Sequence, residues 1–197
     1  MGKRLFDLLG AGVALLLLAP LMLAVALWIK LDSKGPVFYR QQRVGRFGVP
    51  FAIHKFRSMH ADAQGLPITV GEDPRITRAG RFLRRTRLDE LPQFIDVLLG
   101  RMSLVGPRPE VPRYVALYPA ALRARALAVR PGLTDPASLD WIDEATLLAA
   151  AADPEKEYVE VILPAKLQRA VAYAEQASLG SDLAVLARTA WALLWRG

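Results

Sequence analysis

A long uncharged apolar run near the N-terminus constrains the fold of this chain more than any other feature. Residues 8–29 contain no charged side chain and consist mainly of Leu, Ala, Val and Met. As an α-helix the run would be about 33 Å long, enough to cross a bilayer core of about 30 Å. A cleaved signal peptide is not expected, because no small-residue cleavage motif leads into a new polar N-terminus. The sequence therefore predicts a membrane anchor helix in residues 1–30 and a cytoplasmic domain in residues 31–197.

Basic residues flank the apolar run on both sides, which conflicts with a simple span. Lys3 and Arg4 precede it, and Lys30 and Lys34 are the first of several basic residues that follow. Because cytoplasmic flanks carry the excess of Lys and Arg, both ends are expected in the cytoplasm. Pro20 lies near the middle of the run, where proline removes a hydrogen bond and kinks a helix. These features favour a re-entrant helix bent at Pro20, and a bitopic helix with a tolerated proline is the alternative.

The composition narrows the class of protein further. Hydrophobic residues make up 53% of the 197 residues, and part of this excess lies in the apolar run. The absence of cysteine excludes a disulfide scaffold and a cysteine-based zinc site. The net charge of +7 suits nucleic acid, an anionic membrane leaflet or phosphorylated substrates, and charge alone does not choose among them.

The segment after the anchor is predicted to form a β-hairpin, a loop and a short helix. Residues 37–44 and 51–57 are rich in β-branched and aromatic side chains, and the linker between them contains Gly and Pro. Glycine and proline also make residues 61–74 an expected exposed loop. Residues 76–85 are predicted to be a short helix with Thr77 near its start.

The next predicted helix has the clearest apolar pattern and leads away from an acidic pair. Gly100 ends it, and Pro92 is acceptable only in its first turn, so the helix is expected to begin near Asp89 as N-cap or first-turn residue. The positive end of the helix would then stabilise anions at this point. The residues predicted to form its buried face have helical spacing: Leu91, Phe94, Ile95, Leu98 and Leu99.

The remainder of the chain is predicted to be a rigid loop followed by helices. Residues 104–109 are too rich in proline for a helix. Residues 112–129, 145–152 and 155–179 are expected to be mostly helical, with an interruption near Pro164.

A last helix is predicted for residues 183–195, capped by Gly180-Ser-Asp182. Trp191 and Trp195 lie one turn apart on it, which suits a membrane–water interface and a soluble core equally well. The elements together predict one mostly helical α+β domain with a small β-hairpin and amphipathic interfacial helices, joined to the kinked anchor.

The motif Arg84-Arg-Thr-Arg-Leu-Asp-Glu-Leu-Pro92 carries the strongest indication of chemistry. Arginine's planar fork suits bidentate contacts with phosphate, and carboxylates such as Asp89 and Glu90 hold Mg²⁺ or attack phosphorus. In the alternative reading Asp89 only caps a helix, Glu90 decorates its first turn, and some arginines face anionic lipid headgroups. The arginines that crowd this motif are Arg75, Arg78, Arg81, Arg84, Arg85 and Arg87.

Other basic positions give weaker signals. Lys55-Phe-Arg57 would be an exposed strand edge if it had no function, and Arg108 stands between two prolines that would display it at low entropic cost. His54 and His60 have no zinc-site spacing and are interpreted as incidental. Because the chain has no Walker loop, dinucleotide fingerprint or nucleophile elbow, phosphate handling is expected from arginines, a metal and a helix N-terminus.

With these residues in place, the chain resembles the small monotopic phosphoglycosyl transferases, which are the initiating sugar-phosphate transferases of bacterial glycan assembly. The likeness covers most of residues 1–135, and its many ordered motifs make it specific. The motifs are Lys3-Arg-Leu-Phe-Asp7, Gly35-Pro-Val-Phe-Tyr-Arg-Gln-Gln-Arg-Val-Gly45, Lys55-Phe-Arg-Ser-Met59, Thr77-Arg-Ala-Gly-Arg-Phe-Leu-Arg-Arg-Thr-Arg-Leu-Asp-Glu-Leu-Pro-Gln93, Met102-Ser-Leu-Val-Gly-Pro-Arg-Pro109 and Arg130-Pro-Gly-Leu-Thr134.

The resemblance implies an enzyme on a re-entrant helix at the cytoplasmic face of the bacterial inner membrane. Such an enzyme moves a sugar 1-phosphate from a UDP-sugar to polyprenol (undecaprenyl) phosphate with Mg²⁺ and releases UMP. It also implies that Asp89 is the nucleophile and that Glu90 assists the metal or the acceptor. Lys55, Arg84 and Arg108 fall on motif positions that the resemblance associates with substrate phosphates. Arg57 and Arg85, which stand beside them in the basic motifs, are also predicted to bind substrate.

The chain departs from the family pattern after Thr134. It continues as Asp135-Pro-Ala-Ser-Leu-Asp140, where many relatives have a glycine and a segment like Ala-Gln-Val-Asn-Gly-Arg. The sugar-recognition side of the site, and hence the sugar and the pathway, is therefore not predicted. Residues 141–197 carry no motif with an assigned role.

Two alternatives remain open at this point. Asp89 and Glu90 could hold Mg²⁺ while the lipid phosphate attacks the UDP-sugar directly, without a covalent intermediate. The protein could also be a membrane-tethered basic module that binds acidic lipid or nucleic acid without catalysis. A nucleic acid partner is not expected, because the aromatic–basic interleaving of single-strand binders is missing.

Overall fold

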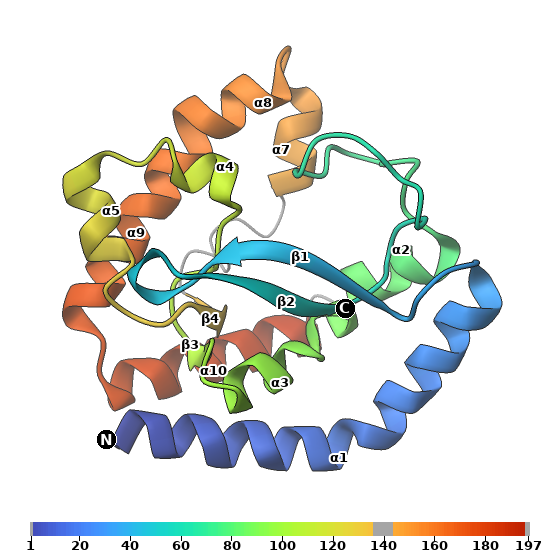
Figure 1. Cartoon of the computed structure of the whole chain (residues 1–197), viewed down its shortest axis with the longest axis horizontal. Helices are drawn as coiled ribbons and strands as arrows, with labels where there is room; N and C mark the ends of the chain where they lie inside the picture. The colour runs from blue at the N-terminus through green and yellow to red at the C-terminus, as the bar shows by residue number, and fades with distance from the viewer. Residues whose placement is uncertain (1, 136–143, 196–197) are drawn as a thin grey trace.

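The computed structural model describes residues 2–135 and 144–195, and the side chains of residues 2–135 and 144–192. Helices dominate and the strands are short, as the sequence predicted for an α+β fold (Figure 1). The elements in chain order are α1 (Gly2–Asp32), β1 (Phe38–Val44), η1 (Arg46–Gly48), β2 (Pro50–Phe56), α2 (Arg78–Arg85), η2 (Leu88–Glu90), α3 (Gln93–Leu98), β3 (Ser103–Val105), α4 (Pro112–Val115), α5 (Ala120–Ala126), β4 (Gly132–Thr134), α7 (Glu144–Ala150), α8 (Pro154–Glu157), η3 (Tyr158–Ile162), α9 (Leu163–Gln176) and α10 (Leu179–Trp195).

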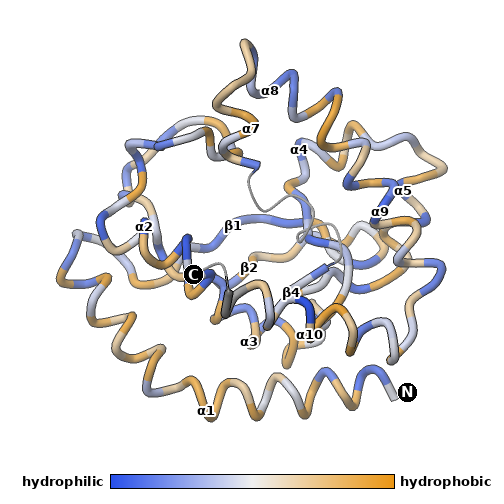
Figure 2. The backbone as a smooth tube through the Cα atoms, turned by 180° about the vertical axis from the view of Figure 1, so that it is seen from behind, coloured by the Kyte–Doolittle hydropathy of each residue, from blue (hydrophilic) through white to orange (hydrophobic). Residues whose placement is uncertain are grey.

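The long helix α1 lies along the edge of the domain and bends part-way along its length (Figure 1). Pro20 lies inside the helix and accounts for a bend, because its ring clashes with the preceding turn. By length and composition α1 is the one helix within the described residues that could cross a membrane. Apolar residues dominate its middle (Figure 2), and Leu16 and Leu17 are 77% and 72% exposed.

Both ends of α1 are bound to the same domain. Near its start, Arg4 donates to the carbonyls of Val97 and Leu98 at 2.8 and 3.1 Å. At its end, Asp32 accepts a hydrogen bond from the backbone N–H of Ala79 at 3.0 Å. A straight span would carry one end to the opposite side of a bilayer, away from these partners. The contacts therefore fit the re-entrant arrangement better than the bitopic one.

Buried polar contacts hold the first turns of α1 in place. Asp7 is 2% exposed and accepts hydrogen bonds from the Ser103 hydroxyl and the Leu104 backbone N–H, both at 3.0 Å. Lys3 forms an ion pair with the buried Asp182 of α10. The beginning of the anchor thus contacts both β3 and the last helix of the chain.

Replacing Asp7 by Ala is expected to lower the free energy of unfolding by about 2–4 kcal/mol, because it leaves the buried donors of Ser103 and Leu104 without an acceptor. Denaturant unfolding of the detergent-solubilised protein measures the change. Asp62→Ala is the matched control, since Asp62 is exposed in the loop before α2. Equal losses in both variants would contradict a docking role for Asp7.

The β-hairpin is confirmed, and a second strand pair was not predicted. Strands β1 and β2 pair antiparallel, with Tyr39 opposite Lys55. Strands β3 and β4 pair in parallel, although the sequence had predicted only a loop from residue 104. The two strands approach so closely that a Cβ on Gly132 would lie 2.1 Å from the backbone nitrogen of Gly106. Three-residue strands that pair across a long sequence separation leave no periodic pattern to detect.

The predictions for the helix after the acidic pair need correction. Asp89 does not cap α3, because a separate 3₁₀ turn holds the acidic pair and α3 begins after Pro92. The predicted buried face is also wrong in part: Leu98 and Leu99 are 39% and 56% exposed. The buried side of α3 instead carries Gln93, Asp96 and Val97. The apolar spacing was that of an amphipathic helix, and spacing alone does not tell which face meets the protein.

The C-terminal helices follow the prediction except at their boundaries. A π-helical turn, η3, precedes Pro164 at the predicted interruption. The last helix begins at Leu179 and includes the residues predicted to cap it, while Ser178 accepts a hydrogen bond from the Ser181 backbone N–H at 3.1 Å. Trp191 is 63% exposed, and the side chain of Trp195 lies outside the described set.

Of the apolar clusters that bind the C-terminal helices to the rest of the domain, two include residues that flank the Arg108 loop. In one, Tyr173 and Val185 pack with Phe51, Val97 and Met102. The second cluster joins the loop before α2 to α4, α7, η3 and α9. Its buried members are Ile68, Val111, Tyr114, Leu148, Tyr158, Ile162 and Leu163. The helices of unassigned role therefore support the segments on both sides of the loop that carries Arg108.

Candidate active site

A cluster of opposite charges gathers residues from β2, η2 and the loop after β3. The Nζ atom of Lys55 lies 2.8 Å from Asp89 Oδ2 and 3.4 Å from Glu90 Oε1. The guanidinium of Arg108 donates to both oxygens of Glu90, at 2.5 and 3.3 Å. The structure thus brings together Lys55, Asp89, Glu90 and Arg108, which the sequence had placed in three separate motifs.

The backbone at Arg87 directs the acidic pair into this cluster. Arg87 has φ 58° and ψ 13°, a left-handed conformation that non-glycine residues seldom adopt, and the 3₁₀ turn η2 follows at once. Such a conformation costs on the order of 1 kcal/mol and persists only where surrounding contacts impose it. The reversal between α2 and η2 buries both carboxylates, with Asp89 2% exposed and Glu90 7% exposed.

The two oxygens of the Asp89 carboxylate have different surroundings. Oδ2 pairs with Lys55, while Oδ1 is buried and has no hydrogen-bond partner within the described chain. A buried carboxylate oxygen without a partner costs free energy, because it loses hydration and gains no hydrogen bond. Oδ1 therefore has its lone pairs available for a cation or an electrophile.

The ionisation of Glu90 is set by its cationic neighbours. Burial alone would raise the pKa of Glu90, but the positive charges of Arg108 and Lys55 and the Arg108 hydrogen bond together hold the pKa far below its ordinary value. The Glu90 charge in turn raises the pKa of Arg108. Both groups are charged at neutral pH, although the Arg108 side chain is 36% exposed and the pair is partly screened by water.

Arg84 lies at the border of the cluster. Its guanidinium donates to the Thr69 hydroxyl at 2.5 Å, and burial lowers its pKa while the charges of Asp89, Asp73 and Glu90 oppose that change. Arg84 is therefore a partly buried cation that interacts electrostatically with the carboxylates of Asp89 and Glu90.

Two predicted substrate-binding arginines do not join the cluster. Arg57 is 4% exposed, and it donates to the Pro36 carbonyl at 2.6 Å and to the hydroxyl and carbonyl of Ser33 at 2.6 and 2.9 Å. It locks the turn between α1 and β1. Arg85 is exposed on α2, with its guanidinium 6.0 Å from the ring centre of Phe82. Arg57 lies just beyond the end of β2, where its contacts with Ser33 and Pro36 direct it toward the end of α1. Arg85 follows Arg84 on α2, and the rotation of the helix turns it to another face.

A histidine–aspartate pair that the sequence did not reveal supports β2 from the other side. Asp96 is fully buried and accepts hydrogen bonds from the backbone N–H and ring Nδ1 of His54, both at 2.8 Å. Because successive strand residues face opposite sides, fixing His54 on α3 leaves Lys55 directed at Asp89. His54 therefore has a structural contact, whereas the sequence interpretation had it as incidental.

Asp135 is a further acidic residue near the cluster. It is 3% exposed, and its charge contributes to raising the pKa of Arg108 after the larger effect of Glu90. The sequence marked this position only as the start of a departure from the family pattern, and residues 136–140 of that departure lie outside the described chain.

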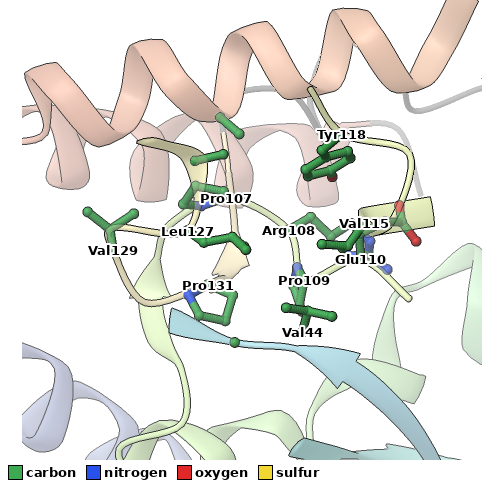
Figure 3. A pocket seen from close by; sticks show the side chains of 13 residues that line it. Val44, Pro107, Arg108, Pro109, Glu110, Val115, Tyr118, Leu127, Val129 and Pro131 are labelled. Carbon is green, nitrogen blue, oxygen red and sulfur yellow. The ribbon is translucent and has the colours of Figure 1, made fainter. Parts of the chain in front are cut away.

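The small pocket beside Arg108 is not large enough for a substrate. It has a volume of about 30 Å³ and is lined by Pro107, Arg108, Pro109, Glu110 and Tyr118 among others (Figure 3). Ligand pockets for small molecules usually measure hundreds of Å³. This space has room for about one or two water molecules, and it lies beside the Arg108 loop away from the paired carboxylates.

Comparison with known proteins identifies the family of the chain. The sequence profile of the family described as bacterial sugar transferase matches residues 1–196. A UDP-glucose:undecaprenyl-phosphate glucose-1-phosphate transferase of Caulobacter vibrioides is 39% identical over 196 residues, covering 98% of this chain and 69% of that protein.

Other relatives are matched over shorter stretches. The exopolysaccharide production protein PSS of Rhizobium leguminosarum bv. phaseoli is 55% identical over 109 residues, which is 54% of each chain. A transferase of Escherichia coli K12 with the same name as the Caulobacter protein is 44% identical over 151 residues, 74% of this chain and 32% of that protein. The chain thus spans from about a third to about two thirds of these relatives. It belongs to the bacterial sugar transferase family.

Proposed function

We propose that this protein transfers a sugar 1-phosphate from a UDP-sugar to polyprenol phosphate, releases UMP, and so initiates assembly of a bacterial glycan. The names of the relatives support the substrates. The observation that carries the proposal is the free, buried Oδ1 of Asp89 in a carboxylate pair surrounded by Lys55, Arg84 and Arg108.

In the first step, Asp89 Oδ1 attacks the β-phosphorus of the UDP-sugar. A bond forms between this oxygen and phosphorus, and the bond between phosphorus and the bridging oxygen breaks, so that UMP leaves with the electron pair. A carboxylate is a workable nucleophile here because phosphate is a good leaving group. The product is a phosphosugar-aspartate.

In the second step, a phosphate oxygen of polyprenol phosphate attacks the same phosphorus. The bond to Asp89 breaks, the carboxylate is restored, and a lipid-linked sugar diphosphate is formed. In the structure, Lys55 and Arg108 form ion pairs with the carboxylates of Asp89 and Glu90. Phosphate oxygens of either substrate could form ion pairs with the same two cations. If substrate phosphates replaced the carboxylates as partners of Lys55 and Arg108, Asp89 would become accessible to the donor. The two cations would then stabilise negative charge in the transition state.

The donor set also fits Mg²⁺. This ion prefers one or two carboxylates completed by substrate phosphates. Asp89 Oδ1 is a carboxylate oxygen without a hydrogen-bond partner in the described residues, and it could bind the ion. Glu90 is the adjacent carboxylate, but it forms ion pairs with Arg108 and Lys55 in this structure. No group of three potential acidic or histidine ligands occurs within the described residues, so phosphates would have to complete the coordination. Bound there, Mg²⁺ would neutralise charge on the phosphates.

The location proposed for the reaction is the cytoplasmic face of the inner membrane. The exposed apolar middle of α1 provides the anchor, and the basic flanks on both sides of it favour the cytoplasmic leaflet with its anionic lipids. In this setting a water-soluble nucleotide and a membrane-embedded prenyl chain meet at one site.

Initial-rate kinetics are expected to show a ping-pong pattern. UMP release is measured with Mg²⁺ over a matrix of UDP-sugar and polyprenol phosphate concentrations, after a screen of UDP-sugars has identified the donor. Since UMP leaves before the acceptor reacts, double-reciprocal plots should be parallel. Intersecting lines would favour direct attack by the lipid phosphate, and no UMP release from any UDP-sugar would reject the enzyme in favour of a non-catalytic lipid-binding module.

A further inference from the structure

The loop that carries Arg108 is fixed by contacts on both of its sides. The Pro109 carbonyl accepts a hydrogen bond from Arg43 of β1 at 2.9 Å, and the Glu110 carbonyl accepts one from the Val44 backbone N–H at 2.9 Å. On the other side, the Pro107 carbonyl accepts from the Gly132 N–H at 2.9 Å. These bonds hold the backbone of the loop, and the prolines restrict its φ angles.

The side chain of Glu110 joins the loop to two distant segments. Its Oε2 accepts a hydrogen bond from the Tyr158 hydroxyl at 2.5 Å, and its Oε1 lies 3.5 Å from a terminal nitrogen of Arg43. Oε1 also accepts from the Val111 N–H at 2.7 Å. Glu110 is thus the point at which β1, the Arg108 loop and the C-terminal helices meet.

Charge and burial make this junction sensitive to the loss of one member. Arg43 is partly buried, with its side chain 19% exposed. Burial lowers its pKa, the Glu110 charge opposes this, and the nearby Arg108 lowers the pKa further. Tyr158 is 2% exposed, and burial together with the Glu110 charge raises its pKa, so the hydroxyl remains a donor. Without the negative charge held at Glu110, Arg43 would be left unneutralised beside Arg108 and would repel it.

We propose that Glu110, held between Arg43 and Tyr158, is a positioning residue that sets the direction of Arg108 toward Glu90 and the donor phosphates. The proposal deepens the function proposed above and rests on it, because Arg108 is taken to bind substrate. It assigns the C-terminal segment a role in the site: Tyr158 reaches the reacting groups only through Glu110 and Arg108. Arg108 and Glu110 both line the small pocket beside this loop (Figure 3).

The test compares two tyrosine-to-phenylalanine variants. Tyr158→Phe removes the donor to Glu110. Tyr114→Phe is the matched control, because its ring lies 4.8 Å from that of Tyr158 in the same cluster, while its buried hydroxyl lies near Glu155 and forms no hydrogen bond with Glu110. Each variant loses one oxygen from the same apolar cluster. Glu110→Gln provides a second disruption, which keeps the shape of the side chain and removes its charge.

The first readout is the kinetics of UMP release. Tyr158→Phe is expected to raise KM for the UDP-sugar about tenfold with a much smaller change in kcat, because a displaced Arg108 loses contact with the donor phosphates in the ground state and the transition state alike. Glu110→Gln should raise KM at least as much, and Tyr114→Phe should leave it unchanged. A purely structural role would lower the thermal midpoints and leave KM at the wild-type value, and that result would overturn the proposal.

The second readout needs no turnover. Hydrogen–deuterium exchange of peptides covering residues 106–112 should be faster in Tyr158→Phe than in Tyr114→Phe, since the Val111 amide is bonded directly to the Glu110 carboxylate. Equal exchange in the two variants would overturn the proposal. If the wild-type protein released no UMP, the proposed function would fail, and the exchange data would still decide whether Tyr158 holds the loop through Glu110.

Discussion

Replacing Asp89 by Asn is expected to lower UMP release by at least about 10³-fold, because an amide cannot form the proposed bond to phosphorus. Lys55 keeps Glu90 as an acidic partner at 3.4 Å, so the domain is expected to remain folded. The loss should therefore appear in the chemical step and not in the amount of folded protein. Thermal unfolding of the detergent-solubilised variant checks this separation.

Trapping the intermediate distinguishes a nucleophile from a metal ligand. A UDP-sugar with a radioactive β-phosphorus is mixed with enzyme and Mg²⁺ without acceptor, and the denatured protein is examined for label. Wild type is expected to become labelled, Glu90→Gln to become labelled more slowly, and Asp89→Asn to carry no label. The covalent route would be contradicted if Asp89→Asn released UMP at the wild-type rate. It would also be contradicted if wild-type protein released UMP without becoming labelled.

Replacing Arg108 by Met is expected to weaken both activity and stability. UMP release at subsaturating UDP-sugar should fall by about 10²–10³-fold, because the donor phosphates lose a fixed cation in the ground state and in the transition state. Removing one partner from a buried carboxylate usually costs 3–5 kcal/mol, but Lys55 remains and Arg108 is 36% exposed. The free energy of unfolding should therefore fall by only about 1–3 kcal/mol.

The stability loss in Arg108→Met should depend on pH in a defined direction. The pKa of Glu90 in the folded protein is depressed, so its contribution is fully present above the unfolded pKa of about 4.3 and is lost as pH falls through the folded value. Without Arg108 the folded pKa rises and this contribution shrinks. The difference between variant and wild type should be largest near neutral pH and should narrow in acid.

Denaturant unfolding between pH 7 and pH 3 provides the measurement for Arg108→Met. Arg101→Met is the matched control, because Arg101 is similarly exposed at 40% and lies 3.6 Å from the buried Asp96. A pH-independent difference between Arg108→Met and wild type would mean that Arg108 does not control the ionisation of Glu90.

Only some of the basic residues that the sequence motifs predicted to bind substrate lie near the acidic pair in the folded protein. Lys55 and Arg108 contact the Asp89–Glu90 pair and Arg84 lies at its border, while Arg57 and Arg85 face other parts of the molecule. A motif records which residues occur in order. The direction of each side chain depends on where β2 ends, on helix rotation and on the left-handed backbone at Arg87.

Features governed by short-range patterns were determined by the sequence itself: the long apolar helix with its internal proline, the β-hairpin, the helix capped by Thr77, and the arginine-rich motif around Asp89. Each depends on hydropathy, residue type and spacing within one segment. The parallel β3–β4 pair, the exposed face of α3 and the link from Tyr158 through Glu110 to the Arg108 loop were decided only by the tertiary structure. They depend on contacts between segments far apart in the chain, whose energies no local pattern contains.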